Sequence, residues 1–186
     1  PREFSAADLA VLGDLGALAE DEFAAISAAT TDELTGLFNR RGFNQLVRFT
    51  LSVARRRAEP LTLGWLDLDR FKEINDRYGH EEGDKALKVM AQLMRSAFRE
   101  ADMLVRFGGD EFAVLFADTD EQGAWIAMQY LAEQVESYNA RKLHPWSLHF
   151  SWGLSEFDHN GNDLQQWLKD ADEKMYAMKQ QRQRAR

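Results

Sequence analysis

Apolar residues recur along the chain with two different periods, which predict where helices and strands lie. Spacings of three and four residues predict helices that each bury one face. These faces are Phe43, Leu46, Val47, Thr50 and Ala54; Leu87, Met90, Leu93, Met94, Ala97 and Phe98; Trp125, Met128, Leu131, Ala132 and Val135; and Leu164, Trp167, Leu168, Ala171, Met175 and Met178. Short runs rich in β-branched and aromatic residues predict strands, at about 61–68, 102–107, 112–117 and 147–155.

The predicted order is helix, strand, helix, hairpin, helix, strand, helix. This order is typical of an α+β domain. We therefore expect a mostly antiparallel central sheet, with the helices packed on one side of it. A chain of 186 residues is long enough for one such domain with a full core and a short extension.

Residues 1–29 differ from the remainder, because alanine and leucine dominate them and their apolar residues approximate a 3-4 spacing. The pattern predicts an N-terminal helix, and two interpretations stay open. The helix either lies on its own domain or connects residues 30–186 to a sensor domain and helps to set a dimer. The chain begins with Pro1 and not with methionine, so we expect it to be a piece of a longer protein.

Two acids stand at the tip of the predicted hairpin. Asp110 and Glu111 follow Gly108 and Gly109, and glycines permit the positive φ angles of a tight turn. Neighbouring carboxylates repel each other unless a cation neutralises them. The pair therefore indicates a metal ligand with a second acid, while an ordinary solvated turn is the alternative.

A second pair of acids lies at the end of an apolar strand. Asp67 and Asp69 should begin on the same face of that strand, about 6–7 Å apart. Buried acids are costly unless they are paired or bind metal. Mg²⁺ binds one or two carboxylates and takes its other ligands from water and phosphate. We therefore expect this strand end and the hairpin tip to converge on one ion.

Four motifs now occur in order along the chain, and together they resemble the GGDEF family of diguanylate cyclase domains. The motifs are Asp32–Arg41, Asp67–Asp76, Tyr78–Asp84 and Gly108-Gly109-Asp110-Glu111-Phe112. The resemblance covers about residues 30–182. It implies a ferredoxin-like core of the type found in nucleotide cyclases and polymerase palms.

The resemblance also implies a set of site residues. Metal ligands for Mg²⁺ or Mn²⁺ would be Asp67, the Leu68 carbonyl, Asp110 and Glu111, and the catalytic residues would be Asp67, Asp110 and Glu111. Glu111 would either bind metal or accept the proton of the attacking 3′-hydroxyl, and Asp69 would either belong to this acidic site or be structural. Substrate contacts would come from Phe71, Lys72, Asn75, Asp84, Arg106 and Lys179.

Two of these substrate contacts would select the base, since Asn75 and Asp84 match the family's guanine-binding residues. An aspartate that accepts from guanine N1–H and N2–H₂ favours guanine over adenine. After Lys179 the chain departs from the family, which usually continues with Gly-Arg. Here Arg182 follows three residues later and would replace the usual contact from a shifted position.

Arg99 and Asp102 stand three residues apart, just before the hairpin. The resemblance identifies them as an Arg-x-x-Asp site at which the product inhibits the enzyme. Arginine can bind phosphate or a guanine edge with two hydrogen bonds. From spacing alone, a salt bridge at the end of a helix is the simpler interpretation.

The implied function is condensation of two GTP molecules into cyclic di-GMP by a symmetric homodimer. A catalytically weak domain that binds cyclic di-GMP or GTP is the alternative, and another nucleotidyltransferase on the same fold is the third possibility. The net charge of −8 argues against a nucleic-acid partner. The chain has no cysteine and no long apolar run, so we expect a cytoplasmic fragment without membrane contact.

Overall fold

A five-stranded sheet forms the centre of the molecule in this computed structural model, which describes residue 15, residues 28–159 and residues 163–184. The strand order is β1-β3-β4-β2-β5. The strands are β1 (Phe38–Asn39), β2 (Leu61–Leu68), β3 (Met103–Gly108), β4 (Glu111–Ala117) and β5 (Phe150–Glu156). Only the β1–β3 pair is parallel among the strand pairs of these described residues. The prediction of a mostly antiparallel α+β fold is confirmed.

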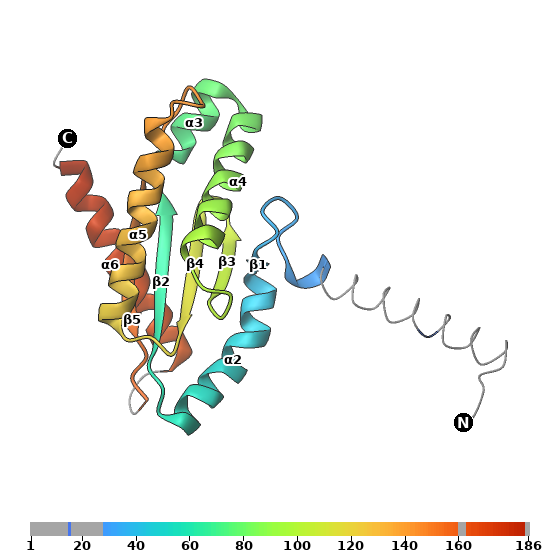
Figure 1. Ribbon diagram of the computed structural model, residues 1–186, viewed down its shortest axis with the longest axis vertical. Helices are drawn as coiled ribbons and strands as arrows, with labels where there is room; N and C mark the ends of the chain where they lie inside the picture. Colours follow the sequence, from blue (N-terminus) through green and yellow to red (C-terminus); the bar gives the residue numbers. More distant parts are fainter. Residues whose placement is uncertain (1–14, 16–27, 160–162, 185–186) are drawn as a thin grey trace, which may run out of the picture.

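The helices cover both faces of the sheet (Figure 1). They are α2 (Arg40–Arg57), α3 (Phe71–Tyr78), α4 (His80–Ala97), α5 (Glu121–Ala140) and α6 (Leu164–Arg184). In β2, Leu66 and Leu68 pack with α4 and α5. Leu61, Leu63 and Trp65 point to the opposite face and pack with α2 and α6. The prediction that the helices lie on one side is therefore wrong. Every residue of β2 is buried, and a strand that is apolar on both faces needs cover on both.

Two elements were not predicted because each is too short to show a period. Strand β1 has two residues and α3 has eight. Two residues assigned to buried helix faces are in fact exposed, since Leu46 is 38% and Trp125 is 46% exposed. Both lie beside the truly buried positions of their helices, which are Val47 in α2 and Ala124 and Met128 in α5.

The predicted N-terminal helix over 1–29 lies outside the described residues, apart from residues 15, 28 and 29. No helix in the part of the chain that the structure describes has the length and apolar character needed to cross a membrane.

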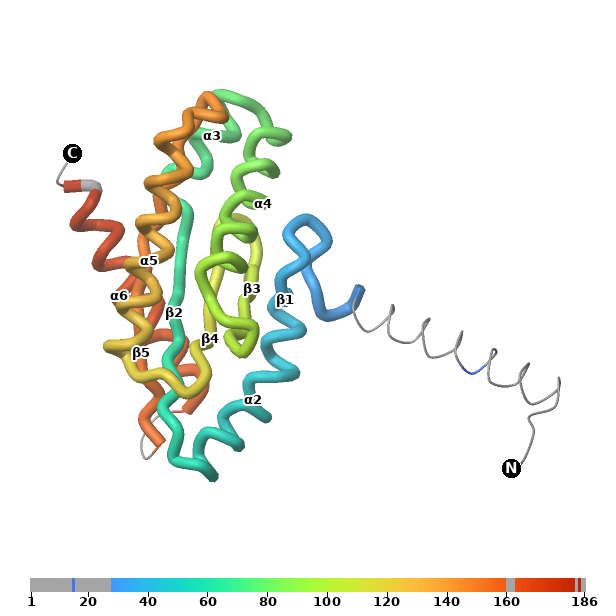
Figure 2. The backbone as a smooth tube through the Cα atoms, viewed as in Figure 1, coloured from blue at the N-terminus to red at the C-terminus, as the bar shows by residue number. Residues whose placement is uncertain are grey.

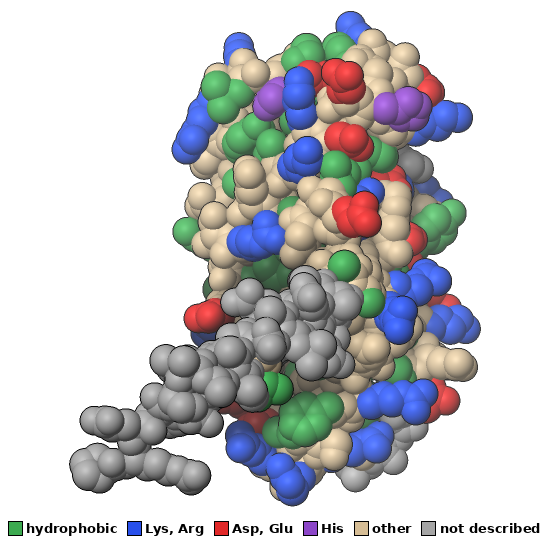
Figure 3. All heavy atoms as spheres, turned by 90° about the vertical axis from the view of Figure 1, so that its right-hand side faces the viewer, with side chains coloured by type: hydrophobic (Ala, Val, Ile, Leu, Met, Phe, Trp, Pro, Cys, Tyr) green, Lys and Arg blue, Asp and Glu red, His purple; other side chains and the backbone are tan. Residues whose placement is uncertain are grey.

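Basic side chains are spread over one face of the molecule despite its negative net charge. Figure 3 shows Lys and Arg in both halves of the face that lies to the right in Figure 1, while most of the visible Asp and Glu lie in its upper half. Helix α2 ends with Arg55, Arg56 and Arg57, whose positive charges interact favourably with the negative end of the helix dipole.

Candidate active site

Asp67 and Glu111 stand directly opposite each other in the antiparallel register of β2 and β4. Paired residues of neighbouring strands project from the same face of a sheet. At the same end, the Leu68 N–H donates a hydrogen bond of 3.1 Å to the Asp110 carbonyl. The strand end and the hairpin tip therefore meet, as the sequence predicts, and Gly108 and Gly109 adopt the expected positive φ angles of 145° and 53°.

Burial, with a smaller contribution from the neighbouring acids, raises the pKa values of Asp67 and Glu111. Burial raises the pKa of Asp67; the hydrogen bond from Lys179 works against this rise, and the charge of Asp110 adds to it. Burial also raises the pKa of Glu111, with further contributions from the charges of Asp67 and Asp110. Carboxylates in such an environment favour a cation nearby.

Helix α6 supplies cations to this strand end. Lys179 Nζ lies 2.5 Å from Asp67 Oδ1. Burial alone would lower the pKa of Lys179, but the hydrogen bond and charge of Asp67 outweigh it and the pKa is raised. Arg182 lies 3.5 Å from Asp69 Oδ2 and also donates to the Phe150 carbonyl. Arg182 therefore lies beside Asp69 at this strand end, and its phosphate contact stays a prediction.

The donor set fits a hard divalent ion that is shared with a substrate. Within the described ranges, no group of three or more His, Cys, Asp or Glu side chains is arranged to hold a metal by itself. However, Mg²⁺ needs only one or two carboxylates when phosphate and water supply the rest. Asp67 already takes a cationic partner, which is the role that an ion would fill. Asp67, Asp110, Glu111 and the Leu68 carbonyl therefore remain the predicted ligands.

The chain turns sharply between β2 and α3. Arg70 adopts a left-handed conformation with φ of 60°, and no side chain caps the N-terminus of α3. Non-glycine residues in this region are uncommon and often lie at functional sites. Phe71 packs against the core while Lys72 is exposed. The first N–H groups of α3 are thus suitable for binding phosphate.

The two predicted guanine-binding residues lie on neighbouring helices, Asn75 on α3 and Asp84 on α4. Asn75 is half-buried and Asp84 is exposed. A Cβ atom on Gly83 would lie only 2.0 Å from Asn75 Oδ1. The absence of a side chain at Gly83 therefore allows the Asn75 amide to lie against the first turn of α4, beside Asp84.

Arg106, a predicted substrate contact, is held by groups of the chain itself. Its Nη1 lies 3.0 and 3.1 Å from the two carboxylate oxygens of Asp32, and its Nε and Nη2 donate to the Gly109 carbonyl. Burial would raise the pKa of Asp32, but hydrogen bonds from Thr35 and Arg106 outweigh it and the pKa is lowered. No local pattern in the sequence indicates this ion pair, because its partners are far apart in the chain.

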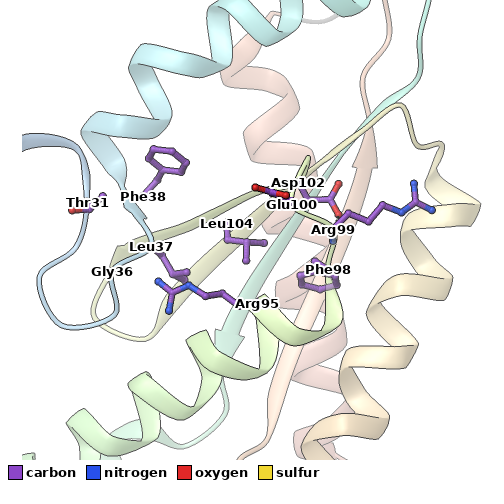
Figure 4. Close-up of a pocket in the computed structure, with 10 residues that line it drawn as sticks. All are labelled: Thr31, Gly36, Leu37, Phe38, Arg95, Phe98, Arg99, Glu100, Asp102 and Leu104. Carbon is purple, nitrogen blue, oxygen red and sulfur yellow. The ribbon is translucent and has the colours of Figure 1, made fainter. Parts of the chain in front are cut away.

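Arg99 and Asp102, which directly precede β3, line a pocket of about 370 Å³. In Figure 4 the Arg99 side chain extends away from Leu37 and Phe38. The half-buried Asp102 accepts backbone N–H bonds from Arg99 at 2.9 Å and from Ala117 at 3.3 Å, and burial raises its pKa. No ion pair joins the two side chains in the described structure, so the simple salt-bridge interpretation is wrong.

The family described as "Diguanylate cyclase, GGDEF domain" matches residues 29–185. The chain belongs to the GGDEF family. As a GGDEF domain, it has its signature at the β3–β4 hairpin tip, beside the end of β2.

Two relatives of this GGDEF domain are named for different enzymes, a phosphodiesterase and a diguanylate cyclase. It is 38% identical over 143 residues to a protein of Pseudomonas aeruginosa named cyclic di-GMP phosphodiesterase NbdA, covering 77% of this chain and 18% of the relative. It is 33% identical over 151 residues to the probable diguanylate cyclase DgcC of Escherichia coli, covering 81% and 41%. The chain therefore spans less than half the length of these two relatives.

One solved structure covers nearly the whole chain. It contains the coiled coil and GGDEF domain of DgcB from Caulobacter crescentus in complex with c-di-GMP, with a TM-score of 0.83 and 26% sequence identity. The match covers 94% of this chain and 93% of that one. This similarity supports the GGDEF fold assigned here.

Proposed function

We propose that this GGDEF domain is a diguanylate cyclase, which condenses two GTP molecules into cyclic di-GMP and two pyrophosphates. The observation that carries the proposal is the opposed pair Asp67 and Glu111, with Asp110 joined to the same strand end through Leu68. The acids could hold a metal ion, while the uncapped N–H groups of α3 and the cations Lys179 and Arg182 of α6 could bind the phosphates. Together they suit a metal-bound triphosphate.

Each GTP would be held from its two ends. The backbone N–H groups of Phe71 and Lys72 and the Lys72 side chain would bind the β- and γ-phosphates. Lys179 and Arg182 would add positive charge. Asn75 would bind guanine O6, while Asp84 would accept from N1–H and N2–H₂. Because these hydrogen bonds require guanine, they would select GTP over ATP.

The reaction is a phosphoryl transfer in which the 3′-oxygen of one GTP attacks the α-phosphorus of the other. The new P–O bond forms as the bond to the pyrophosphate leaving group breaks. A Mg²⁺ or Mn²⁺ ion held by Asp67 and Asp110 would supply charge neutralisation and lower the pKa of the hydroxyl. Glu111 would either accept the 3′-hydroxyl proton as a general base or ligate the metal.

Two attacks are needed to close the cyclic product, and one domain holds one GTP. The active unit would therefore be a symmetric homodimer in which two sites face each other. Product bound at Arg99 and Asp102 would hold the domains apart, with a coupling free energy of about 1–3 kcal/mol as is typical of allosteric sites.

Purified protein incubated with GTP and Mg²⁺ tests the proposal when the nucleotides are separated by chromatography. Formation of cyclic di-GMP supports it, and Asp110→Ala should abolish turnover while product still binds. One relative is named a phosphodiesterase, which favours a non-catalytic nucleotide-binding module as the second candidate. Binding of GTP or cyclic di-GMP without GTP consumption would support that candidate and contradict ours.

A further inference from the structure

The loop that joins α5 to β5, residues 141–149, is attached to the first turn of α4. The two segments lie side by side at the upper end of the molecule (Figures 1 and 2). Trp146 Nε1 donates a hydrogen bond of 2.7 Å to Glu82 Oε2. The His144 ring stacks on Trp146 at 4.3 Å with 10° between the planes, and its Nδ1 lies 3.5 Å from the same oxygen.

The loop is a fixed support for Glu82. Trp146 is only 8% exposed and belongs with Leu148 to the core cluster that contains the buried faces of α4 and α5. Asn139, near the end of α5, makes two hydrogen bonds to the backbone of Leu148, of 2.7 and 2.9 Å. The indole N–H is thus held by packing and cannot follow Glu82 if the helix end moves.

Glu82 directly precedes the residues that contact the proposed guanine site. Gly83 packs against Asn75, since a Cβ atom at position 83 would lie only 2.0 Å from Asn75 Oδ1. Asp84 is the next residue. Three consecutive residues of α4 therefore anchor the helix, contact one base-binding side chain and supply the other. The first turn of a helix lacks internal partners for its N–H groups and frays easily, so an external anchor has a large effect there.

We propose that Glu82 and Trp146 are positioning residues for guanine selection, in that their hydrogen bond holds the first turn of α4 where Asp84 can read the 2-amino group. This inference rests on the proposed function. Hydrogen-bond recognition tolerates displacements of only about 0.5 Å. A small shift of α4 would therefore weaken base reading before it weakens phosphate binding.

The test compares GTP with ITP, which lacks the 2-amino group, in wild-type protein and in Trp146→Phe. Phenylalanine keeps most of the buried ring and removes the N–H donor. We expect the GTP-over-ITP preference in kcat/KM to fall about five- to tenfold, as for the loss of one hydrogen bond. The change should lie mainly in KM for GTP, with kcat nearly unchanged. A thermal unfolding curve for each variant separates lost selectivity from lost folding.

Three further variants identify the contact. Glu82→Gln keeps an acceptor for the indole and should stay close to wild type. Glu82→Leu should lose at least as much selectivity as Trp146→Phe, because it removes the indole contact together with the contacts of Glu82 with Lys85 and His144. The double variant Trp146→Phe with Glu82→Leu should lose no more selectivity than Glu82→Leu alone, because that single variant already removes the indole contact. Glu81→Gln is the matched control, since Glu81 lies on the same turn and is exposed.

Two contradictory outcomes can be told apart. Wild-type selectivity in Trp146→Phe and Glu82→Leu would overturn this inference alone, even if their Tm values fall. A wild-type protein that does not prefer GTP to ITP would overturn it together with the proposed guanine site.

Discussion

Asp67 and Glu111 face each other across neighbouring strands while Lys179 Nζ lies 2.5 Å from Asp67 Oδ1. Directly opposed like charges destabilise a sheet. The protein therefore retains a repulsive pair at this strand end and offsets part of the repulsion with a cation from α6. Such a cost is expected where the acids serve function and not stability.

Replacing Glu111 with Gln should stabilise the folded protein at pH 7 while it abolishes turnover. Removing one of the two opposed charges should raise the free energy of unfolding by about 0.5 kcal/mol. The pKa of Glu111 is raised in the folded state, so this acid lowers wild-type stability as the pH rises through that pKa. The gain in stability from Glu111→Gln should therefore vanish below the pKa of a glutamate in the unfolded chain, near 4.3. Urea unfolding at pH 7 and pH 3.5 measures both values, and equal gains at the two pH values would contradict this account.

Replacing Lys179 with Met should destabilise the protein and increase its stabilisation by Mg²⁺. Asp67 and Lys179 are 12% and 25% exposed at their side chains, so loss of the pair should cost about 1–2 kcal/mol, between surface and buried pairs. Without the competing ammonium, Mg²⁺ alone should raise the Tm more than in wild type, because a ligand stabilises the state that it binds. Tm measured with and without Mg²⁺ checks this, and Lys169→Met on the exposed Lys169–Glu173 pair is the control. A smaller Mg²⁺ effect in Lys179→Met would contradict metal binding at Asp67.

Much of this arrangement follows from local sequence, and the remainder depends on distant contacts. The buried strand β2 and the glycine turn before Glu111 were predictable from composition and spacing. The two-sided cover of the sheet was not, because a short apolar run does not tell which layers pack on it. The pairs Arg106–Asp32 and Trp146–Glu82 each join distant segments, and nothing in the local pattern of either segment indicates its partner.

The two residues of the Arg-x-x-Asp site should behave differently when they are replaced. Arg99→Ala should relieve inhibition by cyclic di-GMP with little loss of stability, because its exposed side chain forms no hydrogen bond or ion pair within the described residues. Asp102→Ala should relieve inhibition and also cost about 1 kcal/mol, since its carboxylate accepts two backbone N–H bonds. Inhibition curves and urea unfolding of both variants check this. Unchanged inhibition in Arg99→Ala would remove the site from the mechanism.

Arg106 either contacts substrate or braces the hairpin, and two variants separate these roles. Its guanidinium joins Asp32 to the Gly109 carbonyl, directly before Asp110 and Glu111. Lysine keeps the charge but cannot form this planar fork. If the bracing role holds, Arg106→Lys should lower kcat about tenfold with little change in KM for GTP, because misplacing catalytic acids weakens the transition state more than binding. Asp32→Asn should reproduce that effect, since Asp32 holds the same guanidinium. A rise in KM for GTP in Arg106→Lys alone would instead show that Arg106 contacts the substrate directly.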